Sequence, residues 1–404
     1  MAVILSILAL LLTMADVYIS LYVVGSTSWL VKGWLFLPAL VYWAFIAWMY
    51  FTGDTRQMLL NGVMWITICV VLPTFVFTVF SIVGKGLGLI WHPLYPIMSW
   101  TGASIAAVWF VIAVYGSVFG WRRLEVKNTD IILADLPENF NGYRIAQLSD
   151  FHIGVYGMIP GAVDKIVERV NSLNPDLIVF TGDLVNTSPD ELAQFSEVLS
   201  RLKAPDGVIS VLGNHDYCIY HRYKGDDTPE RALARVVKSE ELMGWNLLRN
   251  QSVQITRGND SIAIIGVENA GSRHFLDKSD LRKALTGLPG NECKILLSHD
   301  PSHWRREVLP TTDIPLMLAG HTHAMQFRLG NFSPSKWTYP EWGGLYREGN
   351  QQLYVSTGVG GNIAFRFGVY PTIDILTLHC DKASNEKLIK PLIKNIRVKP
   401  TQKR

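Results

Sequence analysis

The most informative stretch of the chain is Tyr143-Arg-Ile-Ala-Gln-Leu148-Ser-Asp150-Phe-His152. A strand-like segment there runs directly into two residues of metal-binding type. Asp150 and His152 lie two apart on the loop that leaves the strand, so both can turn toward one ion. A single Asp-x-His motif is usually a surface loop. We therefore interpret it as a metal-binding motif only because similar motifs follow other strand-like segments of the chain.

Four further motifs follow strand-like apolar runs. Leu177–Phe180 leads to Gly182-Asp183, Val208–Leu212 to Gly213-Asn214-His215-Asp216, Lys294–Leu297 to Ser298-His299, and Leu316–Leu318 to Gly320-His321-Thr322-His323. Helical spacing occupies 160–173, and Ser188-Pro189-Asp190-Glu191 is typical of a helix start. Ligands of open α/β sheets gather beyond the carboxyl ends of strands. The sequence therefore predicts an α/β domain with a site assembled from strand-end loops.

The side chains in these motifs have the chemistry of a site for two metal ions. A carboxylate such as Asp183 can bridge two cations, and Asn214 offers a neutral amide oxygen. The imidazoles of His299, His321 and His323 favour Mn, Fe, Zn or Ni over Mg or Ca. Each motif can occur by chance, but their ordered co-occurrence behind strands predicts a dinuclear centre.

Such a centre binds a phosphoryl group and lowers the pKa of a bridging water, and the leaving group then needs a proton. His215 follows a predicted ligand, Asn214, but is unsuited to reach the same ion, so we predict that it is the general acid. The remaining histidines lack such partners and are interpreted as ordinary surface or core residues: His92, His221, His274, His303 and His379. Among them, His303 is close enough to His299 to merit one mutation.

Residues 1–121 differ from the rest because they are mostly apolar. Four stretches, at about 3–25, 33–52, 59–83 and 97–120, are each long enough as a helix to cross a hydrocarbon core. Tryptophans lie near their ends, as in interfacial belts: Trp29, Trp34, Trp48, Trp91 and Trp121. A buried globular helical domain would need a polar outer face that these segments barely have. We predict a bundle of four transmembrane helices.

Positive charge favours a cytoplasmic soluble domain in an integral, multi-pass inner (cytoplasmic) membrane protein. Arg56, Arg122, Arg123 and Lys127 would share one side with the amino terminus, against Lys32 and Lys85 on the other. The four cysteines show no paired or CxxC spacing, which suits a reducing compartment.

Asp16 lies near the middle of the first predicted span, where a carboxylate is expensive. It should face the bundle interior or be protonated. Its role is either a substrate or partner contact, or a buried acid hydrogen-bonded to a neighbouring helix, and the second is favoured.

With these motifs in order, residues 140–378 resemble the calcineurin-like metallophosphoesterase superfamily, in particular its membrane-anchored, YkuE-like bacterial branch. Gly142–Ile145, Leu148–Gly154 and Leu353–Gly358 carry the branch resemblance. The resemblance implies a β-sandwich flanked by helices. It also implies a first metal held by Asp150, His152, Asp183 and His323, a second held by Asp183, Asn214, His299 and His321, and protonation of the leaving group by His215.

The chain departs from the family pattern in two places. The Asp that often orients the catalytic histidine is Asn186, so His215 is either oriented by Asp216, which we include among the catalytic residues, or less polarised. The usual Gly-Gly after the last motif is Ala324-Met325. An aromatic loop at 331–350 then follows, and it forms either an acyl-chain pocket or a hydrophobic mini-core: Phe332, Trp337, Tyr339, Trp342 and Tyr346.

We therefore expect three regions: a transmembrane part at 1–121, a metallophosphoesterase domain at 122–380, and a basic tail at 381–404. The tail holds eight Lys or Arg against two acids and is either attracted to anionic lipids or simply solvated. The expected activity is hydrolysis of a phosphodiester or pyrophosphate, with two Mn, Fe or Zn ions. The substrate would be lipid-linked, such as the UDP-diacylglucosamine-type pyrophosphate that the resemblance implies, and no nucleic acid is expected. The alternatives are a metal-binding scaffold or sensor with little turnover, and a transporter-like role for the helices.

Overall fold

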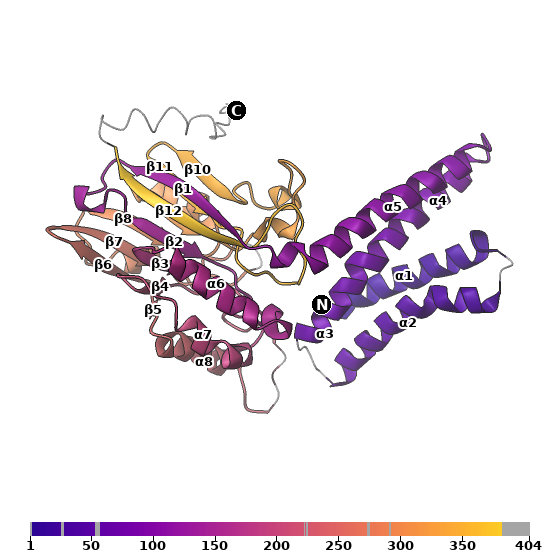
Figure 1. The fold of residues 1–404 in the computed structure, drawn as a ribbon, viewed down its shortest axis with the longest axis horizontal. Helices are drawn as coiled ribbons and strands as arrows, with labels where there is room; N and C mark the ends of the chain where they lie inside the picture. The colour runs from indigo at the N-terminus through magenta and orange to yellow at the C-terminus, as the bar shows by residue number, and fades with distance from the viewer. Residues whose placement is uncertain are drawn as a thin grey trace. The chain divides into compact units, whose positions relative to one another are not determined.

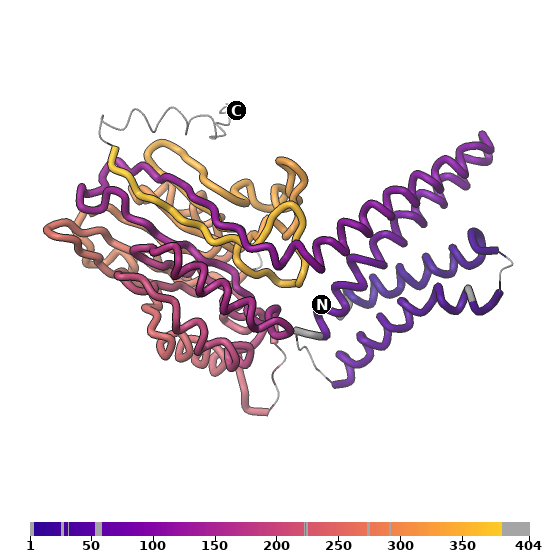
Figure 2. The backbone as a smooth tube through the Cα atoms, viewed as in Figure 1, coloured from indigo at the N-terminus to yellow at the C-terminus, as the bar shows by residue number. Residues whose placement is uncertain are grey.

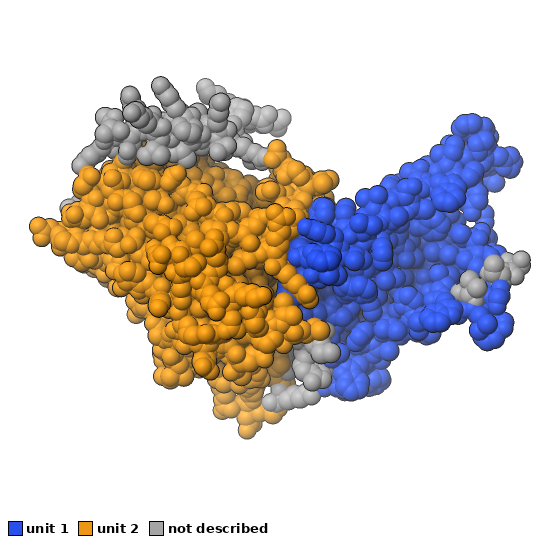
Figure 3. All heavy atoms as spheres, viewed as in Figure 1, with its two compact units in different colours: residues 1–121, 363–367 blue, residues 122–362, 368–404 orange. Residues whose placement is uncertain are grey.

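The computed structural model describes residues 2–25, 28–52, 57–221, 223, 225–272, 275–290 and 292–381. The chain divides into two compact units, shown in blue and orange in Figure 3. Unit 1 comprises Met1–Trp121 with Ile363–Phe367, and unit 2 comprises Arg122–Asn362 with Gly368–Arg404. The predicted basic tail lies, from residue 382 onward, outside the described residues.

Unit 1 is helical, and its helices are drawn in indigo to purple in Figure 1. They are α1 (Ala2–Tyr22), α2 (Trp29–Thr52), α3 (Gln57–Ile66), the π-helical segment η1 (Thr67–Val71), α4 (Leu72–Leu87) and α5 (Leu94–Val118), followed by the 3₁₀ turn η2 (Gly120–Arg122). As predicted, four helices are long and apolar enough to cross a membrane: Ile4–Tyr22, Lys32–Thr52, Leu59–Leu87 and Leu94–Arg122. The third runs through α3, η1 and α4 without interruption.

The π-helical turn in the third helix is closely followed by Pro73, which leaves one backbone carbonyl without its main-chain donor. In a π-helix the N–H of residue i+5 bonds the carbonyl of residue i, and at Ile68 that donor would be Pro73, which has no N–H. Trp109 of α5 replaces it, because its indole Nε1 donates to the Ile68 carbonyl at 2.9 Å. The backbone acceptor is thus satisfied inside an apolar helix, as a lipid environment requires.

Asp16 is buried in unit 1, with 2% of its surface exposed, as expected for an acid that faces the interior of a bundle. Its Oδ2 has no hydrogen-bond partner among the described residues. The favoured interpretation, a buried acid hydrogen-bonded to a neighbouring helix, stays a prediction.

Unit 2 contains two six-stranded sheets. In the first, the order is β1 (Glu125–Leu133), β12 (Thr372–Cys380), β2 (Arg144–Leu148), β3 (Leu177–Phe180), β4 (Val208–Ser210) and β5 (Asn246–Leu247). In the second, it is β10 (Gly344–Glu348), β11 (Gln351–Val355), β9 (Leu316–Ala319), β8 (Cys293–Leu297), β7 (Asp260–Gly266) and β6 (Gln251–Arg257). Strands β2 to β5 pair in parallel, as do β7, β8, β9 and β11.

The core lies between the two sheets, which confirms the predicted β-sandwich. Ile145, Val179 and Ile209 of the first sheet share one buried cluster with Ile295 and Leu318 of the second. The alternate residues of β7, β8 and β9 face outward, where Ile265, Leu296 and Met317 pack with Trp304 and Val308. Both faces of these strands are buried, which explains why they appear in the sequence as continuous apolar runs.

Helices flank the sandwich (Figures 1 and 2). The α-helices are α6 (Gly161–Ser172), α7 (Ser196–Leu199), α8 (Pro229–Leu242), α9 (Leu281–Ala284) and α10 (Leu309–Thr311). The short 3₁₀ and π segments are η3 (Glu138–Phe140), η4 (Ile153–Met158), η5 (Pro189–Gln194), η6 (Trp304–Val308), η7 (His323–Gln326) and η8 (Pro334–Trp337). The helix predicted after Ser188 is the 3₁₀ helix η5, closed by a capping box between Ser188 and Glu191.

Glu240 is a carboxyl buried inside unit 2, on α8. It is fully shielded from solvent, and the Ser210 hydroxyl of β4 donates a hydrogen bond to its Oε2. Burial raises the pKa of Glu240 to about 8, because the ionised form would lose its hydration.

This raised pKa predicts that unit 2 loses stability as the pH rises. Between pH of about 4.5 and 8 the folded state keeps a proton that the unfolded state releases. The free energy of unfolding therefore falls with pH across this window, by up to about 1.4 kcal/mol per pH unit. We expect Glu240→Gln to remove this pH-dependent part of the free energy of unfolding, because glutamine does not titrate. The variant should therefore be more stable than the parent protein at pH 8 but not at pH 4.5.

Thermal unfolding of the detergent-solubilised chain at both pH values measures the difference. Glu241→Gln is the matched control, because this neighbour is exposed and its side chain forms a surface pair with Lys238. Equal pH dependence in the parent protein and in Glu240→Gln would contradict the prediction.

Candidate metal centre

The five predicted motifs meet at one edge of the sandwich. Asp150 and His152 follow β2, Asp183 follows β3, and Asn214 follows β4, three adjacent parallel strands of the first sheet. His299 follows β8, and His321 and His323 follow β9, which are neighbours in the second sheet. Their loops carry side chains toward a common point because the carboxyl ends of these strands share one edge.

The first group of potential ligands comprises Asp150, His152, Asp183 and His323, all buried, with one ligand atom from each within 4.8 Å of the others. The Nε2 atoms of His152 and His323 are 3.1 Å apart. His152 Nε2 is 3.5 Å from Asp183 Oδ2, and His323 Nε2 is 3.5 Å from Asp150 Oδ1. Imidazole and carboxylate lone pairs that converge in this way fit a cation.

The second group shares Asp183 with the first and adds His299 and His321. His299 Nε2 lies 3.1 Å from Asp183 Oδ2 and 3.2 Å from His321 Nδ1. His299 Nδ1 donates to the Thr181 carbonyl at 2.7 Å, so Nε2 is the atom that would bind a metal after losing its proton. The oxygen Oδ2 of Asp183 therefore faces ligands of both groups.

Asn214 also fits a metal ligand. Its Nδ2 donates to the Tyr220 hydroxyl at 3.0 Å, and its buried Oδ1 has no hydrogen-bond partner in the described part of the chain. An unpartnered buried amide oxygen is costly unless something coordinates it. Tyr220 also stacks on His215, with ring centroids 4.6 Å apart. Sequence reasoning missed this tyrosine, because nothing local marks it as a neighbour of the site.

The ligands are presented by strained backbone. Five of them have left-handed φ angles: Asp150 (54°), His152 (43°), Asp183 (60°), His321 (70°) and His323 (47°). This conformation costs an L-residue roughly 1–2 kcal/mol. Gly213 and Gly320 allow the loops to close, because a Cβ would lie 2.2 Å from Asp183 Oδ1 at Gly213 and 2.0 Å from Ser149 Oγ at Gly320. Strain concentrated in this way is typical of a functional site.

Burial and mutual charge set the protonation states of the cluster. Burial raises the pKa of Asp150 to about 7 and lowers that of His152 to about 3 and that of His321 to about 4. For His299, burial alone would lower the pKa, but the Asp183 carboxylate outweighs it and raises the value to about 10. Neutral His152 and His321 have free lone pairs, and Asp183 draws positive charge to the centre.

His215 lies beside the cluster and is half-buried, with its ring 4.7 Å from that of His152. Its Nδ1 bonds the backbone carbonyl of Asn186 at 2.6 Å, so Nδ1 carries a proton. Its Nε2 faces Asn362 Nδ2 at 3.4 Å. The histidine is thus oriented by the main chain at 186, a contact that the Asp-to-Asn departure at this position leaves intact.

Asp216, which was predicted to be catalytic, uses both carboxylate oxygens to accept hydrogen bonds from backbone N–H groups. Its Oδ2 accepts from the N–H groups of Asp183 and Gly213, both at 2.8 Å, and its Oδ1 accepts from those of Leu184 and Val185 at 2.8 and 3.1 Å. The structure records no hydrogen bond from this carboxylate to the His215 ring among the described residues. Its catalytic role stays a prediction.

Glu191 plays a similar part for the loop that holds Asn186. Its Oε2 accepts from the N–H groups of Gly154 and Asn186, and its Oε1 from those of Thr187 and Ser188. The Glu191 carboxylate therefore fixes the loop whose Asn186 carbonyl orients His215. The capping pattern at Ser188 was visible in the sequence, but its link to the site was not.

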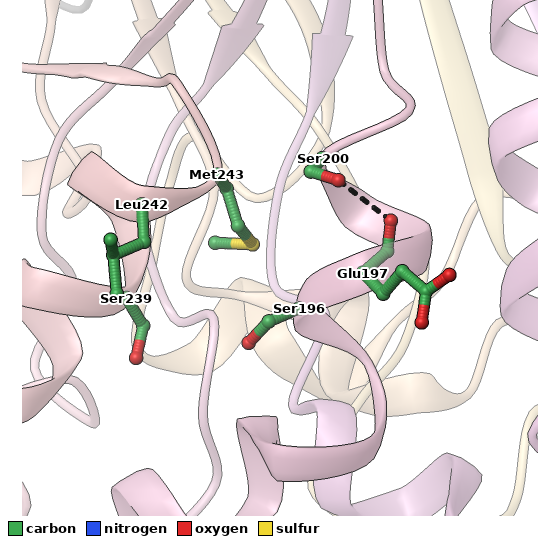
Figure 4. A pocket seen from close by; sticks show the side chains of 6 residues that line it. All are labelled: Ser196, Glu197, Ser200, Ser239, Leu242 and Met243. Carbon is green, nitrogen blue, oxygen red and sulfur yellow. Dashed lines mark hydrogen bonds between the residues drawn. The ribbon is translucent and has the colours of Figure 1, made fainter.

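Two other features lie outside the centre. His303 bonds Ser298 Oγ and Glu307 Oε2, each at 2.9 Å, and belongs to neither group of ligands. A shallow hollow between α7 and α8, drawn in Figure 4, is lined by Ser196, Glu197, Ser200, Ser239, Leu242 and Met243. It shares no residue with the metal ligands.

Comparison with known proteins gives consistent matches. Residues 143–325 match the model of the calcineurin-like phosphoesterase family. The chain is 32% identical to the uncharacterised metallophosphoesterase YkuE of Bacillus subtilis, over 65% of this chain and 90% of that protein. It is 31% identical to the UDP-2,3-diacylglucosamine pyrophosphatase LpxG of Chlamydia muridarum, over 60% of this chain and 86% of that protein.

A third relative, the transmembrane protein with metallophosphoesterase domain of Danio rerio, is 32% identical over 62% of this chain. The chain spans about half of that protein, 56% of its length. The match to YkuE over most of its length, the family match and the buried cluster of carboxylates and imidazoles agree with one another. The chain belongs to the calcineurin-like phosphoesterase family.

Proposed function

We propose that the protein is a membrane-anchored phosphohydrolase with a dinuclear metal centre, cleaving a phosphodiester or pyrophosphate bond. The observation that carries this proposal is Asp183, whose buried carboxylate belongs to both groups of ligands. In this proposal Asp150, His152, Asp183 and His323 hold one ion, and Asp183, Asn214, His299 and His321 hold the other. Imidazole-rich sites of this kind favour Mn, Fe or Zn.

The two ions would supply Lewis acidity for the phosphoryl group and acidify the attacking water. The remaining chemistry is proton transfer by His215. With Nδ1–H held by the Asn186 carbonyl, the doubly protonated ring would deliver the proton on Nε2 to the leaving oxygen and remain neutral with its proton on Nδ1. Asn362 Nδ2, which lies 3.4 Å from that atom, can donate to it once the ring is neutral.

In the same proposal, Asp216 supports the centre without touching the substrate. Its four backbone contacts tie the loop after β3 to the loop after β4. These loops present Asp183, Asn214 and His215, so their spacing depends on this carboxylate.

A lipid-linked substrate at a membrane surface is the second part of the proposal. Four helices suited to span a membrane support it, as does the pyrophosphatase named for a diacylated nucleotide sugar among the relatives. Phe332 and Trp337, 40% and 78% exposed, make an edge contact with each other and offer apolar surface for acyl chains. Tyr339 of the same loop is instead buried, so only part of the expected acyl pocket is exposed.

We also propose that the protein resides in the inner membrane with unit 2 in the cytoplasm. The support is the count of positive charges flanking the apolar helices, where Arg122, Arg123 and Lys127 immediately follow the last one. Addition of a membrane-impermeant thiol reagent to intact cells, with a cysteine in place of the exposed Leu242, tests this orientation; labelling before lysis would contradict it.

The first prediction concerns Asp183. The purified chain with Mn²⁺ should hydrolyse bis-(p-nitrophenyl) phosphate, and Asp183→Asn should abolish hydrolysis and lower the bound metal, because the shared ligand loses its charge. Asp313→Asn is the control, since that carboxylate is 80% exposed and forms a surface pair with Lys294. Full activity in Asp183→Asn would refute the assignment. Two bound ions without hydrolysis of any phosphoester would favour the scaffold alternative.

The second prediction concerns His215 and separates proton donation from metal binding. His215→Gln should reduce kcat by about 10²–10⁴ for an alkyl phosphodiester, whose leaving group needs a proton, and far less for p-nitrophenol. Bound metal should be unchanged. His379→Gln, which removes a histidine paired with Asp130, controls for the loss of an imidazole. Equal losses with both leaving groups would argue against a general acid.

The third prediction concerns Asp216→Asn. An amide has one acceptor oxygen, so two of the four backbone N–H groups would lose their partner, at a cost of roughly 2–6 kcal/mol in unfolding free energy. The melting temperature and metal affinity should fall together. Asp206→Asn, at a carboxylate that accepts from Tyr143, is the comparison. A variant that keeps its stability but loses turnover would instead support the catalytic role.

A further inference from the structure

The turn that carries His321 and His323 is unusually strained. From residue 321 to 326, five non-glycine residues have φ between 46° and 70°: His321, His323, Ala324, Met325 and Gln326. The family resemblance leads one to expect Gly-Gly where this chain has Ala324-Met325, and both residues adopt the left-handed conformation that glycine tolerates without cost. A turn of this kind persists only if its surroundings hold it.

The aromatic loop supplies that hold through hydrogen bonds. The Ser333 hydroxyl donates to the Ala324 carbonyl at 2.6 Å. The Thr322 hydroxyl donates to the Trp342 carbonyl at 2.7 Å. A third contact reaches a ligand itself, because the Tyr339 hydroxyl lies 2.7 Å from His321 Nε2.

Tyr339 and Phe275 enclose the His321 ring. Their rings make edge contacts with the imidazole, at centroid distances of 5.2 and 4.9 Å. Tyr339 is 9% exposed, so its hydroxyl is held in place. On the opposite side of the ring, Nδ1 points to the second group, 3.2 Å from His299 Nε2.

These contacts decide which nitrogen of His321 carries the proton. A ligand nitrogen must present a lone pair, so if Nδ1 faces the metal, Nε2 carries the proton and donates it to the tyrosine oxygen. Metal-binding histidines generally need such a partner on the other nitrogen, and its loss typically costs 10- to 100-fold in metal affinity.

We propose that Tyr339 is a positioning residue for the second metal site, fixing both the tautomer and the ring orientation of His321. The aromatic loop then acts mainly as a clamp on the strained turn. This inference rests on the proposed dinuclear centre, and it assigns to Tyr339 a role that the acyl-pocket and mini-core interpretations both lack.

The test is Mn²⁺ binding to the full detergent-solubilised chain after chelation, measured by titration calorimetry. Tyr339→Phe keeps the ring and removes only the acceptor oxygen. We expect two sites in the parent protein, and in the variant one site of unchanged affinity and one weakened by about 10- to 100-fold. Circular dichroism and the melting temperature of each chelated protein show whether the fold is kept.

The matched control is Tyr143→Phe. It removes a hydroxyl with an equally short hydrogen bond, 2.6 Å to Asp206, but at the amino end of β2, away from the strand ends that carry the ligands. It should leave both affinities unchanged. A folded Tyr339→Phe variant that binds two ions as tightly as the parent protein would overturn the inference. A parent protein that binds no second ion would overturn the proposed function instead.

Discussion

The constraint on which this structure depends is the convergence of electron-rich side chains on one small volume. Two carboxylates, four imidazoles and an amide oxygen meet there, almost all of them buried. Their lone pairs and like charges repel one another unless a cation is bound. The chain brings them together by ending five parallel strands at one edge and turning sharply after each, and five of the ligands adopt left-handed backbone to do so.

A strained centre of this kind needs support from residues that never touch a substrate. Two buried or half-buried carboxylates, Asp216 and Glu191, accept backbone N–H groups and fix the loops after β2, β3 and β4. The turn after β9 is held by the Asp150 carboxylate, which accepts from the His321 N–H, and by hydrogen bonds with the aromatic loop. The rigidity of the site therefore comes largely from hydrogen bonds between side chains and the backbone.

Much of the fold was predictable, because its signals are local. The buried strands appear as short apolar runs, and the predicted run Leu177–Phe180 coincides with β3. The residues predicted to be metal ligands lie one or a few positions beyond the ends of these strands. The helix predicted at Ser188 is the 3₁₀ helix η5, whose start is closed by the capping box between Ser188 and Glu191.

The apolar helices, the strands and the candidate metal-binding donors could be predicted from the sequence alone. The signal for each lies in neighbouring residues and their spacing. The folded structure was needed to show which atoms of these side chains form hydrogen bonds with one another and with the backbone. In the folded structure a main-chain carbonyl orients His215, the Asp216 carboxylate accepts backbone N–H groups, and the Tyr339 hydroxyl contacts His321. The physical reason is that these contacts depend on where whole loops meet in space, and a hydrogen bond between such loops leaves no periodic trace in the sequence.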